Sequence, residues 1–247
     1  MYSFCENVLD ATQSYGNCQK IEDLRRTLLS NTNTVEVTDL GAGSRSIATN
    51  TRIIKDIAST SLSPKFQCEF LNRLIHFAQP SSIIELGTSL GLSALYMKEG
   101  SPSSKLISLE GCPNIAKVAS NNFQTVDPNS DIEIVVGNFN DTFGDVLGKL
   151  DSVDFVYFDG NHQEQPTIDY FHKALAYKNP NSIFLFDDIY WSKGMKSAWE
   201  QIKTHNSVKA SIDLFYFGII LFKEDFQEKQ DFRLIPKKYK PFKKGWI

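Results

Sequence analysis

Apolar runs alternate with amphipathic segments along most of the chain. From residue 82 onward, five short apolar runs are each followed by a segment whose apolar residues recur every three or four positions. This is the pattern of buried strands followed by helices. Two further apolar runs, 209–215 and 217–224, follow each other directly and predict an antiparallel hairpin. The five earlier strands are expected at 82–86, 105–110, 132–137, 153–160 and 182–188.

Strands that alternate with helices pair in parallel through right-handed crossovers. The strands are apolar almost throughout, as expected when helices cover both faces of the sheet. We therefore predict an α/β fold: a doubly wound, mostly parallel, Rossmann-like sheet of seven strands that ends in an antiparallel hairpin. Two helices are expected before it, at 18–29 and 63–78, and the first belongs to an N-terminal helical extension.

The same pattern suggests three regions. We expect an N-terminal extension or cap at 1–62, a cofactor-binding α/β domain at 63–224 and a basic C-terminal tail at 225–247. Neither internal repeats nor low-complexity segments interrupt the sequence, so one principal core is predicted.

Composition narrows the class of protein. The chain has 247 residues, 41% of them hydrophobic, and a net charge of -3, which gives no general attraction to nucleic acid or membrane. Its apolar runs are shorter than the ~20 residues of a membrane span, and its first residues lack the apolar segment of a secretory signal. The four cysteines are scattered and form no C-x-x-C pair. We therefore expect a cytoplasmic protein without a zinc site or disulfide framework.

Two segments have the strand, acid and glycine turn of a nucleotide-binding unit: VEVTDLGAGSR at 35–45 and SSIIELGTSLGLSALYM at 81–97. Such a loop must open a helix so that backbone N–H groups face the ligand. An acid should close the next strand about 20 residues later and hold the ribose hydroxyls. Only the second segment meets both conditions, because a helix follows Gly87 and Glu110 ends the next strand. The first is interpreted as a local turn, with the alternative that it lies over the active site.

The spacing of the second loop restricts the cofactor. The loop has the form Gly87-x-x-x-Gly91, and Ser89 stands where a dinucleotide fold needs glycine for close approach to pyrophosphate. This argues against NAD and FAD, and the absence of a G-x-x-x-x-G-K-[ST] sequence argues against ATP in a P-loop. A nucleoside cofactor without phosphates, held at its ribose by an acid, agrees with the spacing.

The segments IIELGTSLGLS, ISLEG, VVGNF and VYFDGNH occur in this order. The chain thereby resembles the class I S-adenosylmethionine-dependent methyltransferases, and within them it is most similar to bacterial O-methyltransferase-like proteins of the catechol and caffeoyl-CoA type. The resemblance covers about residues 80–223 and implies S-adenosyl-L-methionine as cofactor. The residues that it assigns to this cofactor are Glu85, Gly87, Thr88, Ser89 and Gly91 at the methionine part, Glu110, Gly111 and Cys112 at the ribose, Asn138 and Phe139 at the adenine, and Asp159 at the neighbouring strand end.

The chemistry is expected where two strands end in polar residues, Asp159 and His162 after one strand and Asp187 and Asp188 after the other. In open α/β sheets, ligands bind at the carboxyl ends of the strands. Methyl transfer requires an aligned acceptor lone pair and removal of the acceptor proton.

Two mechanisms stay open at this point. In the first, His162 is the general base, because its ordinary pKa of about 6.5 suits neutral pH. In the second, Asp159, Asp187 and Asp188 hold a divalent cation that lowers the pKa of the acceptor. Metal-dependent relatives resemble this set but have an amide where this chain has Asp188, so the metal stays unknown. Structural alternatives are that Asp188 caps the next helix and that His162 bonds to a backbone group.

The expected function is therefore S-adenosylmethionine-dependent methyl transfer, at oxygen, to a small-molecule acceptor. Membrane and nucleic acid are not expected partners, and a homodimer is left open. One alternative is an RNA or protein methyltransferase that uses the basic, aromatic tail PKKYKPFKKGW at 236–246 as its binding surface. The other is a non-catalytic module that keeps the fold and the cofactor.

Overall fold

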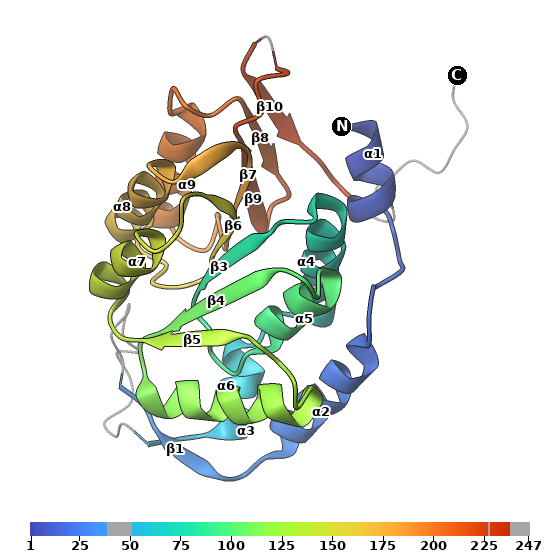
Figure 1. Cartoon of the computed structure of the whole chain (residues 1–247), viewed down its shortest axis with the longest axis vertical. Coiled ribbons are helices and arrows are strands. Elements are labelled where there is room, and N and C mark those ends of the chain that lie inside the picture. Colours follow the sequence, from blue (N-terminus) through green and yellow to red (C-terminus); the bar gives the residue numbers. More distant parts are fainter. Residues whose placement is uncertain (39–50, 227, 238–247) are drawn as a thin grey trace.

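The computed structural model describes residues 1–38, 51–226 and 228–237 and is built around one large sheet (Figure 1). This sheet has eight strands in the order β10-β8-β9-β7-β6-β3-β4-β5. In a separate two-stranded sheet, β1 and β2 pair in antiparallel orientation. The strands are β1 (Thr34–Glu36), β2 (Thr51–Ile53), β3 (Ser82–Leu86), β4 (Lys105–Glu110), β5 (Glu133–Val136), β6 (Val153–Phe158), β7 (Lys178–Asp187), β8 (Ala210–Asp213), β9 (Phe217–Leu221) and β10 (Gln230–Arg233).

Helices cover both faces of the large sheet (Figure 1). One apolar core lies between the sheet and α7, α8 and α9. The other lies between the sheet and α4, α5 and α6, and the N-terminal helices add to it. The helices are α1 (Tyr2–Phe4), the π-helix η1 (Cys5–Leu9), α2 (Cys18–Ser30), α3 (Ile54–Ser61), α4 (Lys65–Ala78), α5 (Leu92–Gly100), α6 (Pro113–Val126), α7 (Phe139–Leu147), α8 (Glu164–Leu175) and α9 (Lys193–Thr204).

Strand β3 lies where the chain changes direction across the sheet. It pairs in parallel with β4 on one side and with β6 on the other. The chain runs from β3 outward through β4 to β5 and then returns to β6 and β7. Parallel sheets open a crevice at the carboxyl ends of the strands at such a point. The fold therefore places the expected ligand site between β3, β4 and β6.

The predicted α/β fold is confirmed, with one difference in the number of strands. The sheet is mostly parallel, and β8 and β9 form the expected antiparallel pair. The eighth strand, β10, lies in the region expected as a tail and pairs in parallel with β8. Its sequence QDFR has only four residues, which alternate between half-buried and exposed positions. It therefore contains no apolar run from which a strand could be predicted.

The N-terminal segments pack on the α4–α6 side of the molecule (Figure 1). The two ends of the described chain also meet, because the backbone N–H of Lys237 donates to the Asp10 carboxylate at 2.7 Å. The glycine-containing segment 39–45 and the tail from residue 238 lie outside the described residues.

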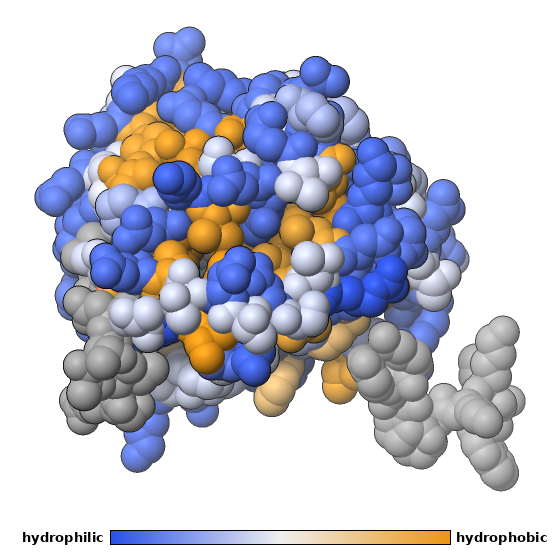
Figure 2. All heavy atoms as spheres, turned by 90° about the horizontal axis from the view of Figure 1, so that it is seen from below, coloured by the Kyte–Doolittle hydropathy of each residue, from blue (hydrophilic) through white to orange (hydrophobic). Residues whose placement is uncertain are grey.

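Hydrophilic and apolar residues both reach the surface on the face seen from below in Figure 2. On the face shown in Figure 2, apolar residues lie in several patches among hydrophilic ones. Across 1–38, 51–226 and 228–237, no helix combines the length and the apolar character that crossing a membrane requires.

Candidate active site

A cavity of about 630 Å³ opens at the carboxyl ends of the central strands. The sheet contributes one wall, and residues 57–64, from the second half of α3 and the turn into α4, contribute another. Many residues predicted from the sequence line it together: Gly87, Ser89, Glu110, Gly111, Cys112, Asn138, Phe139, Asp159, His162, Asp187 and Asp188. Glu85, Thr88 and Gly91 are not among the lining residues.

The glycine loop is a tight turn between β3 and α5. The backbone N–H groups of Gly87 and Thr88 both donate to the carbonyl of Leu109, at 3.0 and 3.1 Å. Ser89 has a positive φ of 48°, and the N–H of Gly91 closes the turn on the carbonyl of Thr88 at 2.8 Å. The loop is thus fixed to β4 before α5 begins at Leu92.

Glu110, at the end of β4, is built into this loop. Its carboxylate accepts the N–H of Ser89 and the N–H of Cys112, each at 2.9 Å. Burial raises the pKa of Glu110, and hydrogen bonds from the backbone N–H groups of Cys112, Ser89 and Gly111 partly offset the effect. A carboxylate has about four acceptor positions, so the protein does not use all of them and a ligand in the cavity can still bond to Glu110. The residue is held in place rather than free in solvent.

Glu85 lies beneath the loop instead of in the cavity. Its side chain is fully buried and accepts hydrogen bonds from the hydroxyls of Ser93 and Ser108. Ser108 also shares a hydrogen bond with the hydroxyl of Thr88. Burial raises the pKa of Glu85 to about 7. Its sequence-based role beside the methionine part stays a prediction, whereas the structure shows it as an anchor that joins β3, β4, α5 and the loop.

Asn138 and Phe139 form the end of the cavity near β5. The Asn138 Oδ1 accepts the N–H of Asn140 at 2.9 Å and caps α7, so its amide nitrogen is the group left for a ligand. Gly160 packs closely here, because a Cβ atom on it would lie 2.5 Å from the Phe139 ring. The aromatic ring of Phe139 is therefore pressed against the loop that follows β6.

Asp159 and Asp187 lie together at the ends of β6 and β7. Asp187 accepts from the Tyr157 hydroxyl at 3.1 Å and from the N–H of Asp188 at 2.9 Å. Burial and the nearby charge of Asp187 raise the pKa of Asp159 well above its usual range. Burial, followed by the charge of Asp188, also raises the pKa of Asp187. Two carboxyl groups in one buried site do not both ionise readily, so the first proton is lost from this pair more easily than the second.

His162 stands beside this acid pair. Its Nε2 lies 3.6 Å from Asp159 Oδ1, and 27% of its side chain is exposed. Burial lowers the pKa of His162, and the negative charge of Asp188 partly offsets that effect. The imidazole is therefore neutral at pH 7, the form in which histidine accepts a proton.

The acids of this cluster do not form a metal site. In the part of the chain that the structure describes, no three His, Cys, Asp or Glu residues are grouped so that they could hold a metal ion. Both oxygens of Asp187 are already hydrogen-bonded within the protein. The donor set does not fit a ready cation site, so we derive no chemical step through a metal.

Several cavity residues could not be found from the sequence. The second wall includes Ile57, Thr60, Leu62 and Gln67, which show no spacing typical of a site. Ser93 and Ser108, which bond to Glu85 outside the cavity lining, are marked in the sequence only as hydroxyl residues within otherwise apolar elements. Their roles depend on packing between distant segments.

Comparison with known proteins shows similarity to methyltransferases. Residues 84–189 match the family described as a methyltransferase domain. The chain is 29% identical over 144 residues to a catechol O-methyltransferase from Niastella koreensis, and this match covers 58% of the chain. It spans 64% of that relative, which is less than two thirds of its length.

Solved structures support the same fold. An O-methyltransferase from Bacillus cereus in complex with SAH superimposes with a TM-score of 0.60 at 20% identity, covering 69% of this chain and 88% of the other. The O-methyltransferase TomG from Streptomyces achromogenes, in complex with SAM, gives a TM-score of 0.57 at 20% identity and coverages of 66% and 82%. Residues 84–189 are therefore similar to a methyltransferase domain, and the predicted Rossmann-like α/β fold is confirmed.

Proposed function

We propose that this protein is an S-adenosylmethionine-dependent methyltransferase that acts on a hydroxyl group of a small molecule. The observation that carries the proposal is Glu110, whose carboxylate is fixed by the N–H groups of Ser89 and Cys112 at the cavity wall. The acceptor capacity that Glu110 keeps suits the ribose hydroxyls. The complexes of the two structural neighbours with SAH and SAM support this cofactor.

The rest of the cofactor would lie along the same wall. The turn at Gly87 and Ser89 would receive the methionine part, and Asn138 and Phe139 would receive the adenine. Because Asn138 Oδ1 caps α7, the hydrogen bond that Asn138 makes to adenine would come from its amide nitrogen. Phe139 would offer its ring as a packing surface.

The acid and histidine cluster would remove the acceptor proton. When bound, the cofactor supplies an electrophilic methyl group on a sulfonium centre. His162 is neutral at pH 7 and would take the proton of the acceptor hydroxyl. The imidazolium that forms would lie near Asp188, whose negative charge favours the protonated ring. Asp159, 3.6 Å from Nε2, would help to hold the ring in position.

The size of the cavity and its second wall favour a small acceptor. A volume of about 630 Å³ lies within the usual range for small-molecule sites. We infer that residues 57–64, where the N-terminal extension joins the helix α4, cover the acceptor and determine which acceptor binds. The named activity of the Niastella koreensis relative supports oxygen as the methylated atom. A cytoplasmic location and a homodimer stay predictions, and the RNA-binding alternative depends on the tail beyond residue 237.

Glu110→Ala is expected to weaken binding of S-adenosylhomocysteine by roughly 1–3 kcal/mol, because a charge-assisted hydrogen bond to the ribose is lost. Calorimetry with S-adenosylhomocysteine, S-adenosylmethionine and NAD measures the effect, and NAD should not bind. Glu133→Ala, at an exposed position of β5, is the control and should bind like the wild type. Equal affinity in the Glu110 variant would refute the ribose assignment.

His162→Ala is expected to lower turnover while the affinity for S-adenosylhomocysteine holds. In the wild type, kcat/KM should rise with pH through the lowered pKa of His162, below 6.5, and level off near neutrality as the imidazole loses its proton. Steady-state assays with catechol as acceptor measure both effects, and His172→Ala, at an exposed position of α8, is the control.

Unchanged turnover in the His162 variant would remove this residue from the mechanism. Activity that is lost in EDTA and restored by Mg²⁺ would favour the cation mechanism instead.

A further inference from the structure

The loop after β7 carries Asp188 and Trp191 into the cavity wall, yet it is held from outside the cavity. The N–H of Asp188 is shared between Asp187 Oδ1 and the carbonyl of Tyr216, each at 2.9 Å. Within the loop, the N–H of Trp191 donates to the carbonyl of Asp188 at 2.9 Å. Asp188 has a positive φ of 54°. Its position therefore depends on the turn between β8 and β9, at residues 214–216.

That turn contains a second unusual backbone conformation. Phe215 has a φ of 76°, a region where a bulky residue is a genuine outlier. The residue is 73% exposed, and its ring stacks on Tyr190 with the ring centroids 5.6 Å apart. Strain of this kind persists only where the surroundings enforce it.

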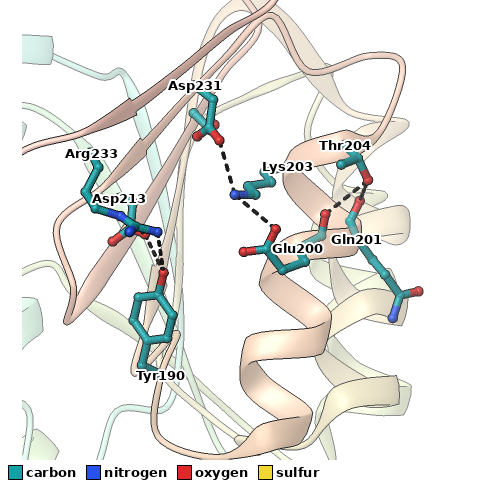
Figure 3. Close-up of polar contacts among 9 residues, drawn as sticks. Tyr190, Glu200, Gln201, Lys203, Thr204, Asp213, Asp231 and Arg233 are labelled. Carbon is teal, nitrogen blue, oxygen red and sulfur yellow. Dashed lines mark hydrogen bonds and ion pairs between the residues drawn. The ribbon is translucent and has the colours of Figure 1, made fainter.

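Asp213 supplies the enforcing contacts (Figure 3). Its side chain is only 3% exposed and accepts from the Phe215 N–H at 2.9 Å and from the Tyr190 hydroxyl at 2.5 Å. Arg233, on β10, donates to Asp213 from Nε at 3.3 Å and to the Tyr190 oxygen from Nη2 at 3.2 Å. A buried carboxylate needs such donors, and here they come from the β7 loop, the β8–β9 turn and β10.

A second group of contacts holds β10 at a different place. Lys203, on α9, bridges Glu200 at 3.0 Å and Asp231 at 3.1 Å (Figure 3). Ser211 also donates to Asp231 at 2.7 Å. These contacts fix β10 to α9 and β8 and include no residue of the β7 loop, so they offer a matched control.

We propose that Asp213, Tyr190 and Arg233 form a clamp that positions the loop bearing Asp188, so that β10 supports methyl transfer from outside the cavity. All three residues lie beyond the matched region 84–189, and none is among the cavity-lining residues. They are positioning residues. The role in turnover rests on the proposed function, whereas the clamp itself rests on the contacts alone.

Tyr190→Phe and Arg233→Ala test the clamp in the full chain. Tyr190→Phe keeps the ring on Phe215 and removes only the hydroxyl. Hydrogen–deuterium exchange of the segment 188–192 should become faster in both variants, because the amides of Asp188 and Trp191 are released more often. Turnover with catechol should fall by about tenfold, while the affinity for S-adenosylhomocysteine stays at the wild-type level. Lys203→Ala should change neither the exchange of this segment nor turnover.

Unchanged exchange in both variants would overturn the clamp, whatever the activity. Faster exchange with wild-type turnover would overturn its role in methyl transfer. An equal loss of cofactor affinity would also overturn it, because that result indicates general damage rather than loop positioning. Wild-type protein that fails to bind S-adenosylhomocysteine would count against the proposed function and not against the clamp.

Discussion

Gly87→Ala is expected to abolish measurable binding of S-adenosylhomocysteine. Gly87 has a φ of 106°, a conformation that is costly for any residue with a Cβ atom. An added Cβ would also collide with the backbone carbonyl of Asp159, lying 2.9 Å from its carbon. Because the obstacle is backbone, no side chain can move aside. Strain and overpacking together should cost about 3 kcal/mol or more, or at least about a hundredfold in affinity.

To make room for the alanine side chain, the glycine loop must move away from the end of β6. This movement displaces the Ser89 N–H from Glu110. Calorimetry with S-adenosylhomocysteine and thermal unfolding would measure the two consequences. Gly144→Ala is the control. Gly144 lies in helix α7, and a Cβ atom on it would meet no atom within 4 Å. It should be neutral or stabilise by roughly 0.5–1 kcal/mol. Wild-type cofactor affinity in the Gly87 variant would show that the loop does not hold the ligand.

Glu85→Gln is expected to stabilise the protein at alkaline pH. The folded-state pKa of Glu85 is raised from 4.5 to about 7 by burial, so the folded protein holds this proton more tightly than the unfolded chain. The stability that the protonated Glu85 contributes to the folded protein is therefore fully present below pH 4.5 and is lost as pH rises through about 7. Above that pH, the buried charge costs about 3 kcal/mol.

Glutamine keeps the shape of the side chain and can still bond to the hydroxyls of Ser93 and Ser108, without a charge. Denaturant unfolding at pH 5 and pH 8 should show that the free energy of unfolding of the variant increases relative to the wild type as pH rises. Asp159 and Asp187 also have raised pKa values, and the comparison with the wild type cancels their contribution. Glu133→Gln, at an exposed position, should show no such gain. A difference between Glu85→Gln and the wild type that is independent of pH would contradict the assignment.

The hydrophobic pattern of the chain predicts the sheet and the edge at which ligands bind. Strand and helix periodicities are local properties, so the apolar runs from residue 82 predicted the elements and their parallel pairing. Polar residues that directly follow buried strands must meet at one edge of such a sheet. Glu110, Asp159 and Asp187 were placed at the site on this basis, and the structure brings all three to one cavity.

Which polar groups face the ligand and which support them depends on packing between distant segments. Glu85 and Glu110 are both acids that follow apolar residues, yet the first is fully buried against Ser93 and Ser108 and the second lines the cavity. Strand β10 has too few residues for a periodic signal, and Arg233 meets Tyr190 across 43 positions of sequence. The wall at 57–64 also has no local pattern. Such contacts depend on where the sheet brings distant segments together, and periodicity within one segment carries no information about that.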